Sequence, residues 1–205
     1  HGKGGSAEEA DRYKMLFPES DVIGFDYKAK NPWDAKKEFP SFFKECRRGY
    51  DSVAVVAASM GAFLTLSSLD ERLVEKACFV SPVVSMEGLI DDLMLRANVT
   101  EKELSEKLEI DTEFGETLSW KYLCYVRNNP IRWNVPTCIL YGEKDELTSI
   151  KTISDFAEKT GAELTVMKDG EHWFHTEAQM QFLDDWIKKA LPLKTHRLWW
   201  RMDGA

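Results

Sequence analysis

A single serine stands where a predicted buried strand passes directly into a predicted helix. Residues 53–58 form an apolar run that is typical of a buried strand, and residues 63–69 are typical of a helix. Ser59 lies between them, and the small residues around it are Ala57, Ala58, Gly61 and Ala62. Small residues let a strand and a helix approach closely and let the turn take a strained backbone. The turn therefore predicts a hydroxyl at the carboxyl edge of a sheet, although a serine that only caps a helix has the same local pattern.

Strands and helices are expected to alternate along the chain. The sequence predicts strands at residues 21–27, 53–58, 76–84, 135–142 and 162–167, and helices at residues 6–17, 31–50, 63–69, 149–160 and 176–191. The second of these helices is expected to bend or break at Pro40, because proline lacks the N–H that continues the helix. The alternation predicts an α/β fold with a mostly parallel sheet and helices on both of its faces.

The stretch 85–133 interrupts this alternation. It holds no convincing strand, and helices are expected at residues 86–95, from about residue 100, and at residues 118–126. We interpret it as a small helical insertion between two strands of one domain, residues 1–191. The tail at 192–205 has no helical or strand pattern, and its role is left open.

Length, charge and cysteines limit the class of protein. The 205 residues fit one domain with a substantial core. The formal net charge of −8 argues against a nucleic-acid or anionic-membrane partner, and no apolar stretch is long enough to span a bilayer. Four scattered cysteines without a C-x-x-C pair, at positions 46, 78, 124 and 138, suggest a reducing compartment and no zinc site. We therefore expect a cytoplasmic protein with a small-molecule partner, in an oligomeric state that the sequence leaves open.

Two residues at predicted strand ends are suited to activate the serine. A serine hydroxyl is a weak nucleophile at neutral pH, so it needs a base within hydrogen-bond reach and a group that orients the base. Asp145 follows the strand at 135–142, and His172 follows the strand at 162–167. Because the carboxyl ends of parallel strands meet at one edge of a sheet, the three side chains are expected to converge there.

Other residues near these positions remain alternatives. Glu143 or Glu146 stands close enough to Asp145 to take the acidic role, and His175 is a neighbour of His172. His196 lies in the tail. Placement in the loop that follows each strand favours Asp145 and His172 over these neighbours.

Several motifs resemble those of the α/β-hydrolase superfamily. Residues 57–61, Ala-Ala-Ser-Met-Gly, are similar to its nucleophile elbow, with alanine in place of the usual first glycine. The order Ser59, Asp145, His172 is the superfamily's order, and the G-x-x-D at 142–145 and the G-x-H at 170–172 are similar to recurring features. The chain thus looks like a small bacterial-type serine esterase or lipase. The resemblance implies that the insertion at 85–133 caps the active site.

The first residues resemble a further part of that superfamily. His1-Gly2-Lys3 is similar to its H-G-x loop, which follows a strand and supplies one oxyanion N–H. The resemblance implies that the backbone N–H groups of Lys3 and Met60 form the oxyanion hole. It also leads us to expect a hydrophobic strand before His1 in the natural protein.

These expectations converge on a serine hydrolase that cleaves a carboxylic ester through an acyl-enzyme. Ser59 is expected to be the nucleophile, His172 the base and Asp145 the orienting acid, with no metal or organic cofactor required. Two alternatives remain. The same three residues would serve a thioesterase, amidase or peptidase, and a binding protein can keep such a fold without turnover.

Overall fold

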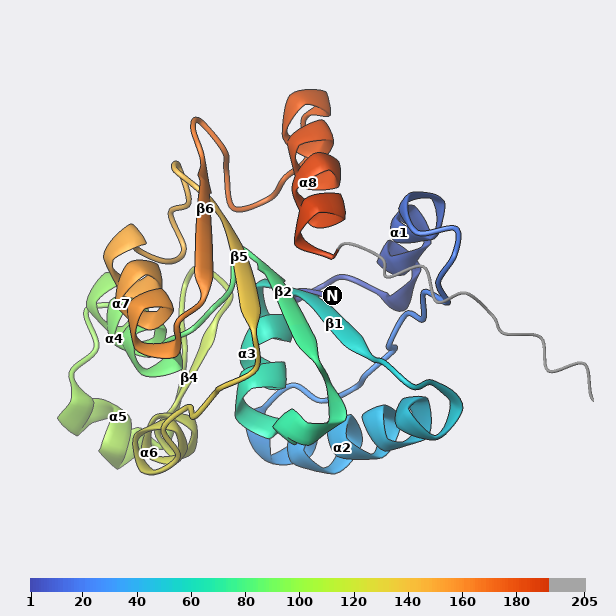
Figure 1. Ribbon diagram of the computed structural model, residues 1–205. Coiled ribbons are helices and arrows are strands. Elements are labelled where there is room, and N and C mark those ends of the chain that lie inside the picture. The colour runs from blue at the N-terminus through green and yellow to red at the C-terminus, as the bar shows by residue number, and fades with distance from the viewer. Residues whose placement is uncertain (192–205) are drawn as a thin grey trace, which may run out of the picture.

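A parallel sheet of four strands forms the centre of the computed structural model, which describes residues 1–191 (Figure 1). The tail at 192–205 lies outside the described residues. The strands stand in the order β1 (Ala54–Ala58), β2 (Lys76–Val80), β5 (Thr137–Gly142) and β6 (Glu163–Met167), and every neighbouring pair is parallel. Every residue of β5 is buried. The predicted α/β fold with a parallel sheet is confirmed.

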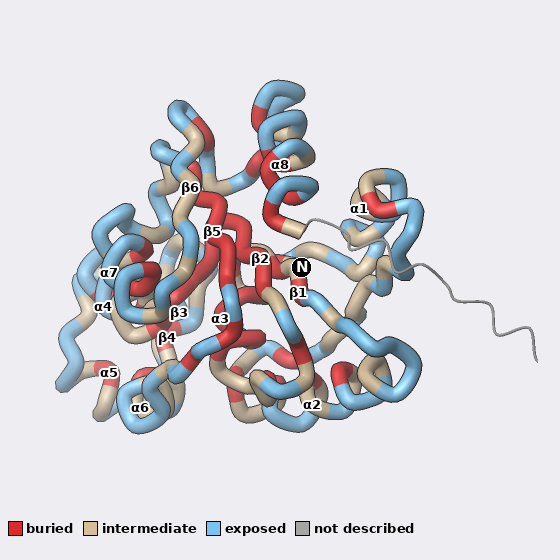
Figure 2. The backbone as a smooth tube through the Cα atoms, in the orientation of Figure 1, coloured by how far each residue is buried: buried red, intermediate tan, exposed pale blue. Residues whose placement is uncertain are grey.

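Helices cover both faces of this sheet. On one face, α2 (Pro32–Gly49) packs against α3 (Ser59–Ser68), and α7 (Ile150–Thr160) adds buried side chains to the same apolar cluster. On the other face, α8 (Glu177–Ala190) and Phe17 pack against Cys78 and Cys138. Figure 2 shows the buried backbone running through the strands between these helical layers. The two strand cysteines are therefore core thiols.

Two predicted helices differ in detail from the observed ones. Residues 6–17 divide into a 3₁₀ turn, η1 (Ala7–Ala10), and the short α1 (Asp11–Leu16), and Ser6 caps the first of them. The helix α2 begins after its cap Asn31 and continues through Pro40 without a break, so the expected interruption is wrong. Buried Phe39 and Phe43 flank the proline, and their packing holds the helix where one backbone hydrogen bond is missing.

The strand predicted at 21–27 is absent from the described residues. The segment still packs on α2, since the Phe25 ring stacks on the Phe42 ring with ring centroids 4.0 Å apart. A Cβ added to Gly24 would lie 2.1 Å from the carbonyl oxygen of Ala7, so the backbone runs tightly against η1. Within residues 1–191, however, no strand pairs with this segment, and without a ladder it is not a β-strand.

The strand predicted at 76–84 ends at Val80. Ser81 follows it with φ of 42°, a left-handed conformation that a strand cannot contain, and Pro82 comes next. A 3₁₀ turn, η2 (Glu71–Leu73), precedes this strand.

The insertion contains helices α4 (Met86–Arg96), α5 (Glu101–Lys107) and α6 (Trp120–Asn128), and also an antiparallel hairpin. The hairpin pairs β3 (Glu109–Asp111) with β4 (Thr117–Ser119), so the expectation that this stretch holds no strand is wrong. Leu118, predicted to begin a helix, belongs to β4. Three-residue strands are too short for their alternation to be recognised against a helical pattern.

None of the helices in residues 1–191 has the length and apolar composition needed to cross a bilayer. The cytoplasmic location stays a prediction.

Candidate active site

Ser59 occupies the sharp turn between β1 and α3. Its φ is 48°, which is uncommon for a residue other than glycine, whereas Ala58 before it is still extended. The Ser59 carbonyl accepts a hydrogen bond from the Val83 N–H at 3.2 Å, and the residue is only 8% exposed. The surrounding structure thus holds a strained serine at the carboxyl edge of the sheet.

Two glycines let residues 1–3, here called the 1–3 loop, lie against this turn. A Cβ at Gly61 would come 2.3 Å from the His1 carbonyl oxygen, and a Cβ at Gly2 would lie 3.3 Å from the Cβ of Ser59. The same His1 carbonyl accepts a hydrogen bond from the Tyr27 hydroxyl at 2.6 Å, and the Tyr27 ring stacks on the His1 ring. Burial raises the pKa of Tyr27 to about 12, so its hydroxyl remains a donor at neutral pH.

The structure brings Ser59, Asp145 and His172 together. The Nε2 atom of His172 lies 3.0 Å from Oγ of Ser59, and its Nδ1 atom lies 2.7 Å from Oδ2 of Asp145. Both distances are those of hydrogen bonds. The Asp145 side chain is fully buried and that of His172 is 10% exposed. The imidazole therefore connects a buried carboxylate to the serine hydroxyl.

The second oxygen of Asp145 is held by its own loop. Oδ1 accepts hydrogen bonds from the backbone N–H groups of Leu147 at 2.8 Å and Thr148 at 3.1 Å. The Tyr141 hydroxyl donates to the Thr148 carbonyl at 2.7 Å, and burial raises the pKa of Tyr141, which keeps that hydroxyl protonated. These contacts fix the direction in which the carboxylate faces the imidazole.

Close backbone packing joins the Asp145 loop to the His172 loop. A Cβ at Gly142 would lie 2.6 Å from the carbonyl oxygens of both Gly170 and Glu171, so only glycine fits there. The Lys144 N–H donates to the Gly170 carbonyl at 2.7 Å, and the Lys144 side chain pairs with Asp169. Periodicity does not predict this role for Lys144 and Asp169, but the Asp-Gly pair at 169–170 is a signal for the turn.

The alternative residues lie elsewhere. Glu143 accepts a hydrogen bond from the Asp169 N–H at 2.9 Å and so connects the two loops instead of facing the imidazole. Glu146 is exposed. His175 has a side chain that is 63% exposed and contacts Glu171 and the Trp173 carbonyl. His196 lies outside the described residues.

The two expected oxyanion donors belong to segments next to Ser59 along the chain or in space. Met60 is the next residue in α3, and Lys3 follows Gly2, which touches the serine. No described residue accepts a hydrogen bond from the Lys3 N–H. The Lys3 side chain is 67% exposed and forms an ion pair with Glu116, in the turn between β3 and β4.

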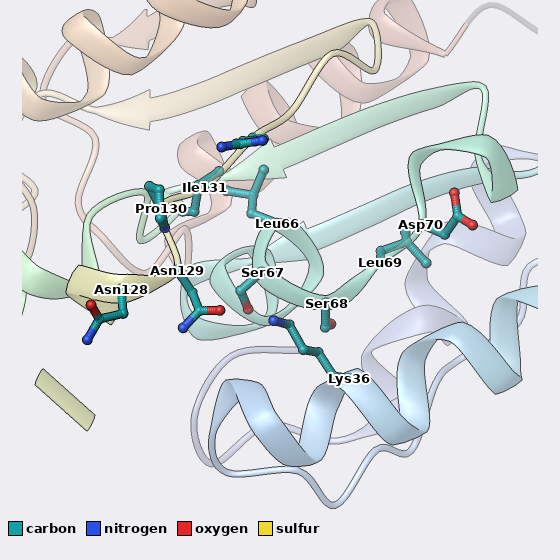
Figure 3. A pocket seen from close by; sticks show the side chains of 11 residues that line it. Lys36, Leu66, Ser67, Ser68, Leu69, Asp70, Asn128, Asn129, Pro130 and Ile131 are labelled. Atoms are coloured by element: carbon teal, nitrogen blue, oxygen red, sulfur yellow. The ribbon is translucent and has the colours of Figure 1, made fainter. Parts of the chain in front are cut away.

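A groove of about 480 Å³ lies at the other end of α3 (Figure 3). Its lining includes Lys36, Ser67, Ser68, Asn128 and Asn129. Because α3 has ten residues, this groove is about 15 Å from Ser59 along the helix axis. It is a separate surface feature, at the ends of α3 and α6.

The four cysteines are free thiols, and burial raises the pKa of Cys78 to about 12. Among residues 1–191, no group of three or more histidine, cysteine or acidic side chains is placed to hold a metal ion.

No protein-family model and no curated protein matches this sequence. Solved structures do match it. Est1E from Butyrivibrio proteoclasticus is 14% identical, with a TM-score of 0.66, over 94% of this chain and 86% of that one. Alpha/beta hydrolase domain-containing protein 10 from mouse is 15% identical, with a TM-score of 0.64 and the same two coverages. An esterase from Pyrococcus furiosus is 18% identical, with a TM-score of 0.60, over 91% and 78% of the two chains. Sheet order, helical layers and these similarities agree that the chain has the α/β-hydrolase fold.

Proposed function

We propose that this protein is a serine hydrolase that cleaves carboxylic esters through an acyl-enzyme on Ser59. The observation that carries the proposal is the pair of contacts of His172, 3.0 Å to the serine oxygen and 2.7 Å to the Asp145 carboxylate. Nucleophilic acyl transfer requires a hydroxyl, an imidazole and a carboxylate that contact one another in this order.

In the first half of the reaction, His172 accepts the proton of Ser59 at Nε2 while Oγ attacks the ester carbonyl carbon. Asp145 keeps the other ring nitrogen protonated and stabilises the imidazolium that forms. The C–O bond to the alcohol then breaks, and His172 gives its proton to the leaving oxygen. Water attacks the resulting acyl-enzyme in the second half, with His172 again as the base, and the acid is released.

The negative charge on the carbonyl oxygen needs donors fixed in advance. In this proposal the backbone N–H groups of Met60 and Lys3 supply them. The N–H of Met60 belongs to the first turn of α3, whose groups have no acceptor within the helix and whose dipole favours an anion. Removal of one such donor typically lowers the rate by about a hundredfold or more.

The insertion at 85–133 is proposed to be the cap of this site. Its hairpin contacts the 1–3 loop through Glu116 and Lys3. Ser59 and His172 are both largely shielded from solvent, which strengthens the electrostatic interactions within the site.

Solved structures with the same fold support an ester as the substrate class. Est1E from Butyrivibrio proteoclasticus has also been solved with ferulic acid bound. That structure matches 94% of this chain with a TM-score of 0.63. Ferulic acid is a carboxylic acid, as is the acyl product of an ester hydrolase. The proposal for this chain is therefore an ester whose acid half is an organic carboxylic acid.

Labelling with a fluorophosphonate probe tests the proposal directly. The probe is expected to modify the purified protein at Ser59, and Ser59→Ala is expected to abolish labelling. Labelling that survives this substitution would place the nucleophile at another residue. No labelling of the parent would contradict a Ser59 nucleophile and favour a binding protein. Turnover of p-nitrophenyl esters beside an acyl-thioester and an anilide then separates an esterase from a thioesterase or amidase.

A further inference from the structure

A bidentate ion pair joins the 1–3 loop to the insertion. The Nζ atom of Lys3 donates to both carboxylate oxygens of Glu116, at 2.7 Å and 2.6 Å. The two residues are 113 positions apart in the sequence. One belongs to the loop that lies against Ser59, and the other belongs to the turn of the β3–β4 hairpin.

The turn that carries Glu116 is well braced. The Glu116 N–H donates to the Thr112 hydroxyl at 3.0 Å, and the Thr112 N–H donates to the Glu116 carbonyl at 2.8 Å. Gly115 takes the left-handed conformation that closes the turn, with φ of 83°. Below the turn, Thr117 donates to the Asp111 carboxylate at 2.6 Å. The backbone of Glu116 is therefore fixed relative to both hairpin strands.

The hairpin is in turn fixed to the core. Leu118 of β4 is 2% exposed and belongs to the main apolar cluster, together with Leu104 of α5. At the base of the hairpin, the backbone N–H of Trp120 donates to the Leu108 carbonyl at 2.8 Å. The backbone that carries the Glu116 carboxylate is thus anchored to packed structure.

After its first two residues, the 1–3 loop has one backbone hydrogen bond of its own, from the Gly5 N–H to the Gly2 carbonyl at 3.2 Å. His1 is held by Tyr27, and Gly2 lies against Ser59. Lys3 is followed by Gly4 and Gly5, and Gly4 has a φ of 80°. A segment with two consecutive glycines has many accessible backbone states, so a tether on Lys3 removes freedom that this single turn hydrogen bond leaves.

We propose that Glu116 is a positioning residue: its ion pair with Lys3 holds the Lys3 backbone N–H where the oxyanion forms. This inference rests on the proposed hydrolase function, in which that N–H is one oxyanion donor. It makes the insertion a contributor to the rate of the reaction as well as a cover. An oxyanion donor must lie within about 3 Å of the developing charge, so a small displacement of the loop weakens it.

The geometry determines which kinetic constant changes. The Lys3 N–H acts on the charge that appears in the transition state, so its displacement lowers kcat more than it raises KM. The side chains of the pair are 67% and 40% exposed, and exposed pairs of this kind correspond to about two- to fivefold in rate. Salt screens such a pair, so the contribution of the pair to kcat is expected to fall as the ionic strength rises.

The test compares Glu116→Gln with Glu113→Gln, which removes the same charge from an exposed position in the same turn. With a p-nitrophenyl ester, Glu116→Gln is expected to lower kcat about two- to fivefold with little change in KM, whereas Glu113→Gln matches the parent. The double reversal Lys3→Glu with Glu116→Lys is expected to recover most of the loss. About 0.5 M NaCl is expected to lower the kcat of the parent to that of Glu116→Gln and to leave the kcat of Glu116→Gln unchanged.

A second measurement reads position without turnover. Amide NMR relaxation at Lys3 is expected to show a more mobile N–H in Glu116→Gln than in Glu113→Gln or in the parent. Equal kinetics and equal relaxation for the two variants would overturn the inference, as would a loss that the double reversal does not recover. A parent that neither turns over esters nor reacts with a fluorophosphonate overturns the proposed function instead, and the relaxation data still decide whether Glu116 holds the loop.

Discussion

Asp145 contacts His172 with a fully buried carboxylate, at 2.7 Å from Oδ2 to Nδ1, although the two residues belong to loops after different strands. The contact exists because β5 and β6 are adjacent and parallel, so their carboxyl ends emerge together. The absence of a side chain at Gly142 then lets the second loop settle onto the first. The relationship between the acid and the base is therefore a property of the sheet edge as much as of the two side chains.

Replacement of Ser59 by alanine is the first test of the site. Ser59→Ala removes the atom that forms the acyl bond, so kcat for a p-nitrophenyl ester is expected to fall by about a thousandfold or more. Ser67→Ala, on the same helix near the distant groove, is a matched control that is expected to retain parent activity. Equal activity of the two variants would place the nucleophile elsewhere.

Asp145→Asn tests the assignment of the acid. An amide in this position favours the wrong imidazole tautomer, so kcat is expected to fall by about a thousandfold to ten-thousandfold while the fold is retained. Glu146→Gln is the control, because it changes an exposed acid in the same loop. A larger loss in Glu146→Gln than in Asp145→Asn would reverse the assignment. Steady-state kinetics, with a thermal melt of each variant, decides between them.

The sequence predicts the positions of Ser59, Asp145 and His172 because each lies in the turn or loop that follows a strand. In a parallel sheet, that placement alone brings side chains to one edge, whatever their separation along the chain. It does not predict the contacts that aim them. The hydrogen bonds from Leu147 and Thr148 to Asp145, and the pairing of Lys144 with Asp169, depend on loop conformations that have no periodic pattern.

The errors in the predicted fold have a related cause. Residues 21–27 have strand-like side chains, but a strand also needs a partner, and its neighbour cannot be recognised from local pattern. The β3–β4 hairpin was missed because three residues per strand give too little alternation. The ion pair of Lys3 with Glu116 follows from that hairpin, so it was missed as well.

Alkaline pH tests the support of the 1–3 loop by Tyr27. Burial raises the pKa of Tyr27 from 10.0 to about 12, so the folded state holds this proton more tightly than the unfolded state. The stabilisation is complete below pH 10 and is lost as pH rises toward 12, since the unfolded chain binds fewer protons there. Urea unfolding of the parent is therefore expected to show a falling free energy of unfolding across this window.

Tyr27→Phe is the matched variant for that measurement. It is expected to be less stable than the parent at neutral pH, because the His1 carbonyl loses its donor, and to lose less stability between pH 10 and 12. Some pH dependence remains in the variant, because burial also raises the pKa of Tyr13 to about 12. An unchanged slope in Tyr27→Phe would mean that the Tyr27 hydroxyl is exposed in solution.

Gly61→Ala tests whether the 1–3 loop must lie against the serine turn for activity. The added methyl group would stand 2.3 Å from the His1 carbonyl oxygen, a backbone atom that cannot rotate away, so the loop must shift. We expect a loss of about 1–3 kcal/mol in the free energy of unfolding and a fall in kcat, because the shift moves the Lys3 N–H from the oxyanion. Gly49→Ala is the control, since a Cβ at Gly49, the last residue of α2, meets no atom within 4 Å.

Urea unfolding and ester hydrolysis of both variants check the prediction. A Gly61→Ala protein that is destabilised but retains full kcat would show that the loop position does not limit the reaction, and parent-like stability would show that the loop does not pack on Gly61.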